Sequence, residues 1–173
     1  MQALEFWKAV TVDQANFLES LISLLAEHQI RYCVVGGQAV NAYVEPLVSL
    51  DFDLVIAAGR LEETLLILSG EFKIDRFSHT VNLSHPGSDL RIQIQTDDRY
   101  SEFVDRSIEK TVLGISLPVA DLRDILQSKV WAAMDANRRG SKRQKDLADI
   151  GRILEAYPDL RPAVPDELLS RLF

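Results

Sequence analysis

The order of apolar and polar residues predicts alternating helices and strands over the first two thirds of the chain. In residues 14–29 the apolar side chains recur every three or four positions, which is the spacing of an amphipathic helix. Residues 90–96 alternate strictly, with Leu90, Ile92 and Ile94 on one face, as in a half-buried strand. The same reasoning predicts these elements in chain order: a helix over 14–29, a strand over 31–37, a short helix over 37–45, a strand over 49–57, a helix over 60–70, strands over 72–77, 80–84 and 90–96, a helix over 98–108 and a strand over 111–117.

The pattern changes at Pro118, after which the apolar spacing is helical throughout. Asp121 is placed to cap the first helix of this part. We therefore expect an α/β (α+β) fold with two parts, an α/β core with an N-terminal helix over residues 1–117 and a helical segment over 118–173 that packs on it. Three helices are predicted in the second part: over 119–139, over 142–157 and over 165–172.

Composition sets limits on the class of protein. The chain has 173 residues, 47% of them hydrophobic, which is enough for a folded core. No run approaches the roughly 18 apolar residues that a membrane span needs, and the N-terminus lacks the layout of a secretory signal. A single cysteine, Cys33, cannot form an internal disulfide, so we expect a cytoplasmic protein. The net charge of −7 argues against nucleic-acid binding over the whole surface.

Two acidic residues interrupt the apolar strand at 49–57. Asp51 and Asp53 are two positions apart, so on a strand their carboxylates point to the same face. Their mutual repulsion is relieved by a divalent cation such as Mg²⁺ or Mn²⁺, which prefers oxygen ligands. Upstream, Gly36 and Gly37 lie at a predicted strand-to-helix junction, where the missing Cβ atoms allow the backbone to approach a phosphate closely. Each feature alone is also compatible with an ordinary turn and a solvated edge strand.

Taken together, the two motifs resemble those of a known family. The residues that carry the resemblance are "VVGG" at 34–37 and "SLDFD" at 49–53. They resemble the nucleotidyltransferase superfamily of DNA polymerase β type, and most closely its small bacterial members related to the AbiEii and MenT toxins and the minimal nucleotidyltransferases. The resemblance extends over residues 31 to about 157. It implies a mixed β-sheet flanked by helices, with a C-terminal helical tail.

The resemblance also implies roles for individual residues. Gly36, Gly37 and Ser49 would grip the triphosphate of a nucleotide, and Asp51 and Asp53 would hold Mg²⁺ as the catalytic acids.

The predicted helices of the tail carry further charged residues at positions that resemble the family. Lys129 would neutralise phosphate charge, and the basic segment 138–145 would contact phosphate oxygens or bind an RNA or protein acceptor. This segment is equally compatible with a solvated helix face. Asp146 and Asp149 share one helix face and are more simply explained as ion-pair partners of lysines that dock the tail. Trp7 and Trp131 are expected to be packing residues.

The sequence departs from the family pattern at two positions. The third catalytic carboxylate is expected at the position of Gln93, which is neutral and cannot act as a base, although its carbonyl oxygen can be a weak metal ligand. Leu47 stands where related members often have an arginine.

These departures leave two main hypotheses for function. In the first, the protein is a Mg²⁺-dependent nucleotidyltransferase that transfers a nucleoside monophosphate from an NTP to a hydroxyl of an RNA, protein or small-molecule acceptor. In the second, it is a catalytically degenerate nucleotide-binding module in a toxin–antitoxin or similar two-component pair with a partner protein. A third hypothesis is an RNA-binding scaffold that uses the segment 138–145.

Overall fold

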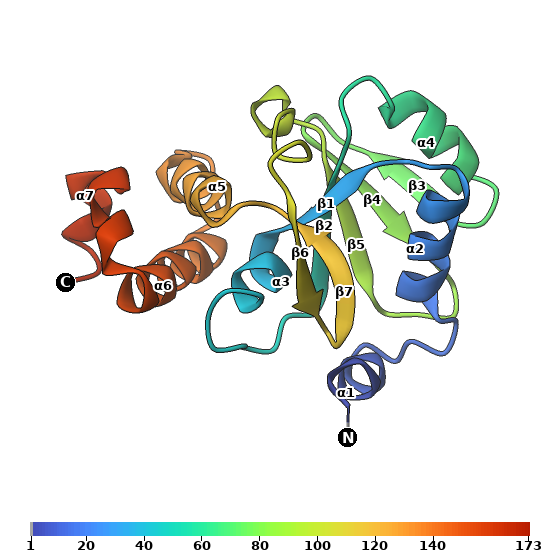
Figure 1. The fold of residues 1–173 in the computed structure, drawn as a ribbon, viewed down its shortest axis with the longest axis horizontal. Helices are drawn as coiled ribbons and strands as arrows, with labels where there is room; N and C mark the ends of the chain where they lie inside the picture. The colour runs from blue at the N-terminus through green and yellow to red at the C-terminus, as the bar shows by residue number, and fades with distance from the viewer. Residues whose placement is uncertain (1) are drawn as a thin grey trace.

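In the computed structural model, which describes residues 2–173, the chain folds around a mixed seven-stranded sheet (Figure 1). The strand order is β3-β4-β5-β2-β1-β7-β6. The central strands combine both directions, since β1 is antiparallel to β2, whereas β2 is parallel to β5. The strands are β1 (Tyr32–Val35), β2 (Asp51–Ile56), β3 (Lys73–Arg76), β4 (Thr80–Ser84), β5 (Arg91–Gln95), β6 (Ile108–Val112) and β7 (Ile115–Val119).

Helices cover both faces of this sheet. Figure 1 shows α2 and α4 on one side, and α3 followed by the C-terminal helices on the other. The helices are α1 (Ala3–Val10), α2 (Phe17–Glu27), α3 (Gly36–Asn41), α4 (Leu61–Leu68), α5 (Leu122–Met134), α6 (Gly140–Ala156) and α7 (Asp166–Leu169). None of the helices in residues 2–173 is both long and apolar enough to span a bilayer.

The alternation along β2 separates the core from the functional face. Phe52 and Leu54 are buried in the apolar core. Asp51 and Asp53 point to the opposite face, and both remain partly exposed. The predicted mixed sheet with flanking helices and a C-terminal helical tail is thereby confirmed, and so is the cap of α5, where the Asp121 carboxylate accepts a hydrogen bond from the backbone N–H of Arg123.

Two local predictions were wrong, and one helix was not predicted. The single strand predicted over 111–117 is a hairpin of β6 and β7, joined by Leu113 and Gly114 with φ of 53° and 81°. Such a two-residue turn with positive φ matches the strand twist, but a leucine at its first position hid it from the sequence. The helix predicted over 98–108 is a 3₁₀ turn over Asp98–Tyr100 followed by further turns. Helix α1 was not anticipated at all.

Candidate active site

The glycine bend lies directly against the acid of β2. Strand β1 ends at Val35 and α3 begins at Gly36, so the strand-to-helix junction lies at the predicted glycine pair, although the strand ends two residues earlier than predicted. Gly36 has a φ of +71°, and a Cβ atom there would collide with the carboxylate of Asp53. A Cβ at Gly37 would lie 3.2 Å from Ser49 Oγ. Only glycine allows this close approach, so the bend, Ser49 and Asp53 form one continuous surface.

The second acid of β2 is engaged by a neighbouring strand. In the parallel pairing of β2 with β5, Asp51 lies opposite Arg91 and Asp53 lies opposite Gln93. Arg91 Nε is 2.7 Å from Asp51 Oδ1 in a largely solvent-exposed ion pair. The face of β5 next to the acids thus presents one cation and two amides, because Gln95 follows Gln93 at the same period. The register places Gln93 where the sequence analysis expected the third carboxylate.

Asp53 is held in an environment that disfavours its charge. Burial raises the pKa of Asp53 to about 6, and the carboxylate of Asp51 adds to the rise, while Lys129 opposes it. The amide of Gln95 donates a long hydrogen bond of 3.5 Å to Asp53 Oδ1. Burial, together with the Asp53 carboxylate, also raises the pKa of the neighbouring Tyr100 to about 12. A carboxyl group with such a perturbed pKa inside a cavity is typical of a functional site.

The tail helices form the opposite wall and are rich in ion pairs. Lys129 Nζ on α5 lies 2.7 Å from Asp149 Oδ2 and 3.3 Å from Asp146 Oδ1 on α6. Asp146 also accepts from Arg138 Nε at 2.8 Å, and Asp149 pairs with Arg152 at 2.8 Å. Burial lowers the pKa of Lys129, but Asp149 and Asp146 outweigh it, so the net pKa lies above its ordinary value. The structure thus shows these two acids as ion-pair partners of a lysine, as the sequence analysis expected.

All seven residues that the sequence singled out line one cavity of about 210 Å³. These are Gly36, Gly37, Ser49, Asp51, Asp53, Gln93 and Lys129. Three residues of the basic segment, Arg138, Lys142 and Lys145, also line it. Sequence reasoning missed Gln95 and Tyr100 as cavity residues. The period-two alternation of β5 was a usable signal for Gln95, whereas Tyr100 is the last residue of a 3₁₀ turn that no sequence pattern predicted.

The donor atoms suit one hard divalent ion better than a closed metal centre. Within residues 2–173, no group of three or more His, Cys, Asp or Glu side chains is arranged to hold a metal. The cavity offers the carboxylates of Asp51 and Asp53 and the amide oxygen of Gln93. These are the oxygen ligands that Mg²⁺ accepts when waters or substrate phosphates complete its shell. The residues present therefore fit a metal that arrives with a nucleotide.

Comparison with known proteins supports this architecture and shows the family to which the chain belongs. Sheet, glycine bend and paired acids define a nucleotidyltransferase-like fold. Residues 36–173 match the family described as nucleotidyl transferase AbiEii toxin of the type IV toxin–antitoxin system, and the chain belongs to this family. No curated protein sequence matches the chain.

Solved structures show the same fold at low sequence identity. ANT(2″)-Ia in complex with adenylyl-2″-tobramycin is 11% identical, with a TM-score of 0.68 over 92% of this chain and 99% of that one. The lincosamide antibiotic adenylyltransferase LnuA, lincomycin-bound, is 16% identical, with a TM-score of 0.55 over 81% and 98%. An antigenic nucleotidyltransferase-like protein from Paracoccidioides brasiliensis is 17% identical, with a TM-score of 0.51 over 91% of each chain. At these identities the similarity concerns the fold alone.

Proposed function

We propose that this protein is a Mg²⁺-dependent nucleotidyltransferase that moves a nucleoside monophosphate from an NTP to a hydroxyl group and releases pyrophosphate. The observation that carries the proposal is the contact between the Gly36 bend and the Asp53 carboxylate, with Asp51 on the same face. Membership of the AbiEii family supports the reaction class. The similarity to adenylyltransferases that act on antibiotics supports the fold that such a reaction uses.

Each candidate residue on the sheet side of the cavity has a role in this proposal. Gly36, Gly37 and Ser49 hold the β- and γ-phosphates against the bend. Asp51 and Asp53 hold the divalent ion, with Mn²⁺ able to replace Mg²⁺, and the ion would neutralise phosphate charge during transfer. Gln93 orients groups through its amide but accepts no proton. Because phosphoryl transfer depends mainly on positioning and charge neutralisation, two carboxylates can support it at a reduced rate.

The wall formed by the tail helices provides the positive charge that a triphosphate needs. Lys142 and Lys145 line the cavity beside the paired Lys129. We propose that the exposed members of the segment 138–145 contact phosphates of the nucleotide, and that the acceptor is an RNA, a protein side chain or a small molecule presented at the same opening. A partner protein of the toxin–antitoxin kind belongs to this proposal as well.

The test is transfer of label from NTPs to components of a cell extract. The unmodified protein is expected to label an acceptor only with Mg²⁺ or Mn²⁺ present, and Asp51→Asn with Asp53→Asn is expected to abolish labelling. Asp75→Asn is the matched control, since it makes the same change on the edge strand β3, where Asp75 pairs with Lys73. Equal labelling by the unmodified protein and the double variant would overturn the proposal.

A second function is favoured by Gln93. If the missing carboxylate abolishes turnover, the protein is a nucleotide-binding module that acts through a partner. Calorimetry with Mg²⁺-ATP followed by a turnover assay separates the two, because binding without any transfer supports the module. Restoring the acid with Gln93→Asp is then expected to produce transfer.

A further inference from the structure

The backbone carbonyl of Ser49 is held by two buried side chains. Trp7 Nε1 donates a hydrogen bond to Ser49 O at 2.6 Å, and Gln38 Nε2 donates to the same oxygen at 3.0 Å. Both donors are only 3% exposed. They come from two different helices, α1 and α3, so the carbonyl is fixed from two directions. We call these two side chains the Ser49 clamp.

The Ser49 clamp fixes the orientation of the Ser49 backbone. The carbonyl of Ser49 is held by the clamp, whereas its side chain lies beside Gly37 in the cavity. Because the C=O and the following N–H of a trans peptide point in opposite directions, the same two bonds orient the Leu50 N–H. Ser49 lies in the connection from α3 to β2, two positions before the strand begins at Asp51. Loss of both donors is therefore expected to loosen this peptide.

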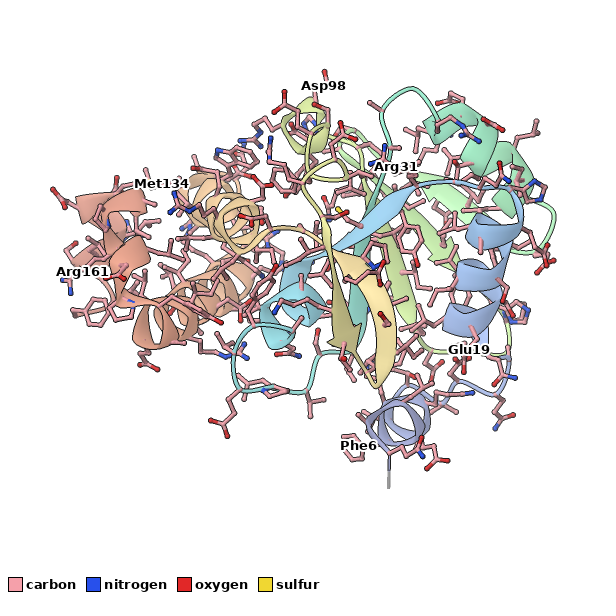
Figure 2. The ribbon with its side chains drawn as sticks, in the orientation of Figure 1. Phe6, Glu19, Arg31, Asp98, Met134 and Arg161 are labelled. Atoms are coloured by element: carbon pink, nitrogen blue, oxygen red, sulfur yellow. The ribbon has the colours of Figure 1, made fainter. Side chains whose placement is uncertain are left out.

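Helix α1 is held firmly enough to support such a role. The Trp7 ring packs against Phe52, the residue between the two acids, with centroids 6.3 Å apart. The end of the helix is tied to the connection between β4 and β5, because Asp89 N donates to Thr11 O at 3.0 Å. Phe6, next to Trp7, is exposed on the same helix (Figure 2). The helix thus presents Trp7 to the site, although α1 lies outside residues 36–173 that match the family.

We propose that Trp7 and Gln38 are positioning residues, which act through Ser49 to hold the phosphate-binding edge of the site in its bound geometry. Helix α1 is then a part of the nucleotide site and not only a cover for the core. The proposal rests on the proposed function, in which Ser49 holds phosphate. It extends the sequence interpretation of Trp7, which foresaw packing but not the hydrogen bond.

The first test measures the backbone around Ser49 without nucleotide. Trp7→Phe keeps an aromatic ring and removes the donor, and hydrogen exchange of residues 44–50 is expected to become at least about fivefold faster. Trp131→Phe is the matched control, since its ring stacks on Phe103 and its indole nitrogen donates no hydrogen bond within residues 2–173. Unchanged exchange in Trp7→Phe, with a folded protein, overturns the clamp regardless of any nucleotide.

The second test measures affinity for Mg²⁺-ATP in a double-mutant cycle. Trp7→Phe and Gln38→Met are each expected to weaken binding about five- to tenfold, the effect of one lost hydrogen bond. In a Ser49→Ala background the same changes are expected to weaken it less than about twofold, because residues that act through one group are not additive. Equal losses in both backgrounds show a purely structural role and overturn the inference.

The outcomes also separate the inference from the proposed function. If the unmodified protein binds none of the four Mg²⁺-NTPs, the proposed function fails and so does the phosphate-positioning role, while hydrogen exchange still decides whether the clamp itself exists. If the protein binds Mg²⁺-ATP and Trp7→Phe leaves affinity unchanged, the inference alone fails.

Discussion

The two walls of the cavity differ in how their acidic residues are paired. The sheet wall is formed by β2, β5 and the glycine bend, and the tail wall by α5 and α6. On the tail wall, Asp146 and Asp149 are each paired with two cations at 3.3 Å or less. On the sheet wall, Asp53 forms no ion pair with a Lys, Arg or His within residues 2–173, and burial raises its pKa to about 6. Asp51 is intermediate, with a single exposed partner in Arg91.

This difference separates structure from function. Paired buried acids lock α5 to α6 and present Lys129 to the cavity in a charged state. An acid whose charge is disfavoured by its own surroundings gives the folded protein no stability at neutral pH. Such a residue indicates a site that a ligand completes, because functional sites often reduce stability. The proposed ligand is a divalent ion bound to a triphosphate.

The largest effect is expected from breaking the tail wall. Asp146→Ala removes one carboxylate that contacts both Lys129 and Arg138, and Asp146 is only 2% exposed. The change leaves Lys129 with Asp149 alone and removes the carboxylate partner of Arg138, and breaking this buried network is expected to lower the free energy of unfolding by about 3–5 kcal/mol. Chemical denaturation measures it. Glu167→Ala, which breaks an exposed pair with Arg171 on the same tail, is the control and should have little effect. Similar losses in the two variants would show that the buried network contributes nothing special.

The next effect is expected at the bend of the sheet wall. Gly36→Ala places a side chain at a φ of +71° and pushes it into Asp53. We expect a loss of about 2–4 kcal/mol in unfolding free energy from backbone strain and overpacking, and at least about a tenfold loss of Mg²⁺-ATP affinity.

Gly59→Ala is the matched control for this change. Gly59 has a similar φ of +78°, but a Cβ there meets nothing within 4 Å. It therefore measures the backbone strain without the collision. If Gly59→Ala weakens nucleotide binding as much as Gly36→Ala does, the contact between bend and acid has no functional part.

A smaller effect is expected from neutralising the unpaired acid. The folded-state pKa of Asp53 lies above its ordinary value of 3.8, so the folded protein binds the proton more tightly than the unfolded chain does. The stability that the protonated form of Asp53 contributes is therefore lost as the pH rises from about 4 to 6. Asp53→Asn is expected to stabilise the protein by about 1–2 kcal/mol at pH 8 and not at pH 3.5.

Thermal unfolding at the two pH values measures this prediction, and Asp105→Asn is the control because Asp105 is an exposed partner of Arg31. Destabilisation of Asp53→Asn at pH 8 would mean that the carboxylate is well solvated or paired, and the contrast between the walls would disappear.

The sequence predicted the sheet wall better than the tail wall, and the reason is physical. Asp51, Asp53 and the glycines interrupt apolar runs, so the local sequence alone indicated that these residues have a function. Gln93 was assigned to the third-carboxylate position by the resemblance to the family, and the structure pairs it with Asp53.

Other parts of the site depend on contacts that no local pattern contains. Trp7 and Ser49 are 42 positions apart, so their hydrogen bond follows from the docking of α1. The ion pairs of Asp146 depend on how α5 packs against α6. The hairpin of β6 and β7 was missed because its turn uses Leu113 at a positive φ, against the usual preference for Asn or Gly.

The smallest effect is expected at Asp51, which lies between the two extremes. Arg91 is 65% exposed, so Arg91→Met is expected to change the unfolding free energy by less than about 1 kcal/mol. Losing a cation that occupies one oxygen of Asp51 should strengthen binding of Mn²⁺ alone by about two- to fivefold, and added salt should reduce the difference. Titration of Mn²⁺ followed by electron paramagnetic resonance measures it. Arg76→Met, which breaks the exposed pair with Glu62, should leave Mn²⁺ binding unchanged. Weaker Mn²⁺ binding in Arg91→Met would instead show that Arg91 organises Asp51 for the ion, and the sheet wall would then resemble the tail wall.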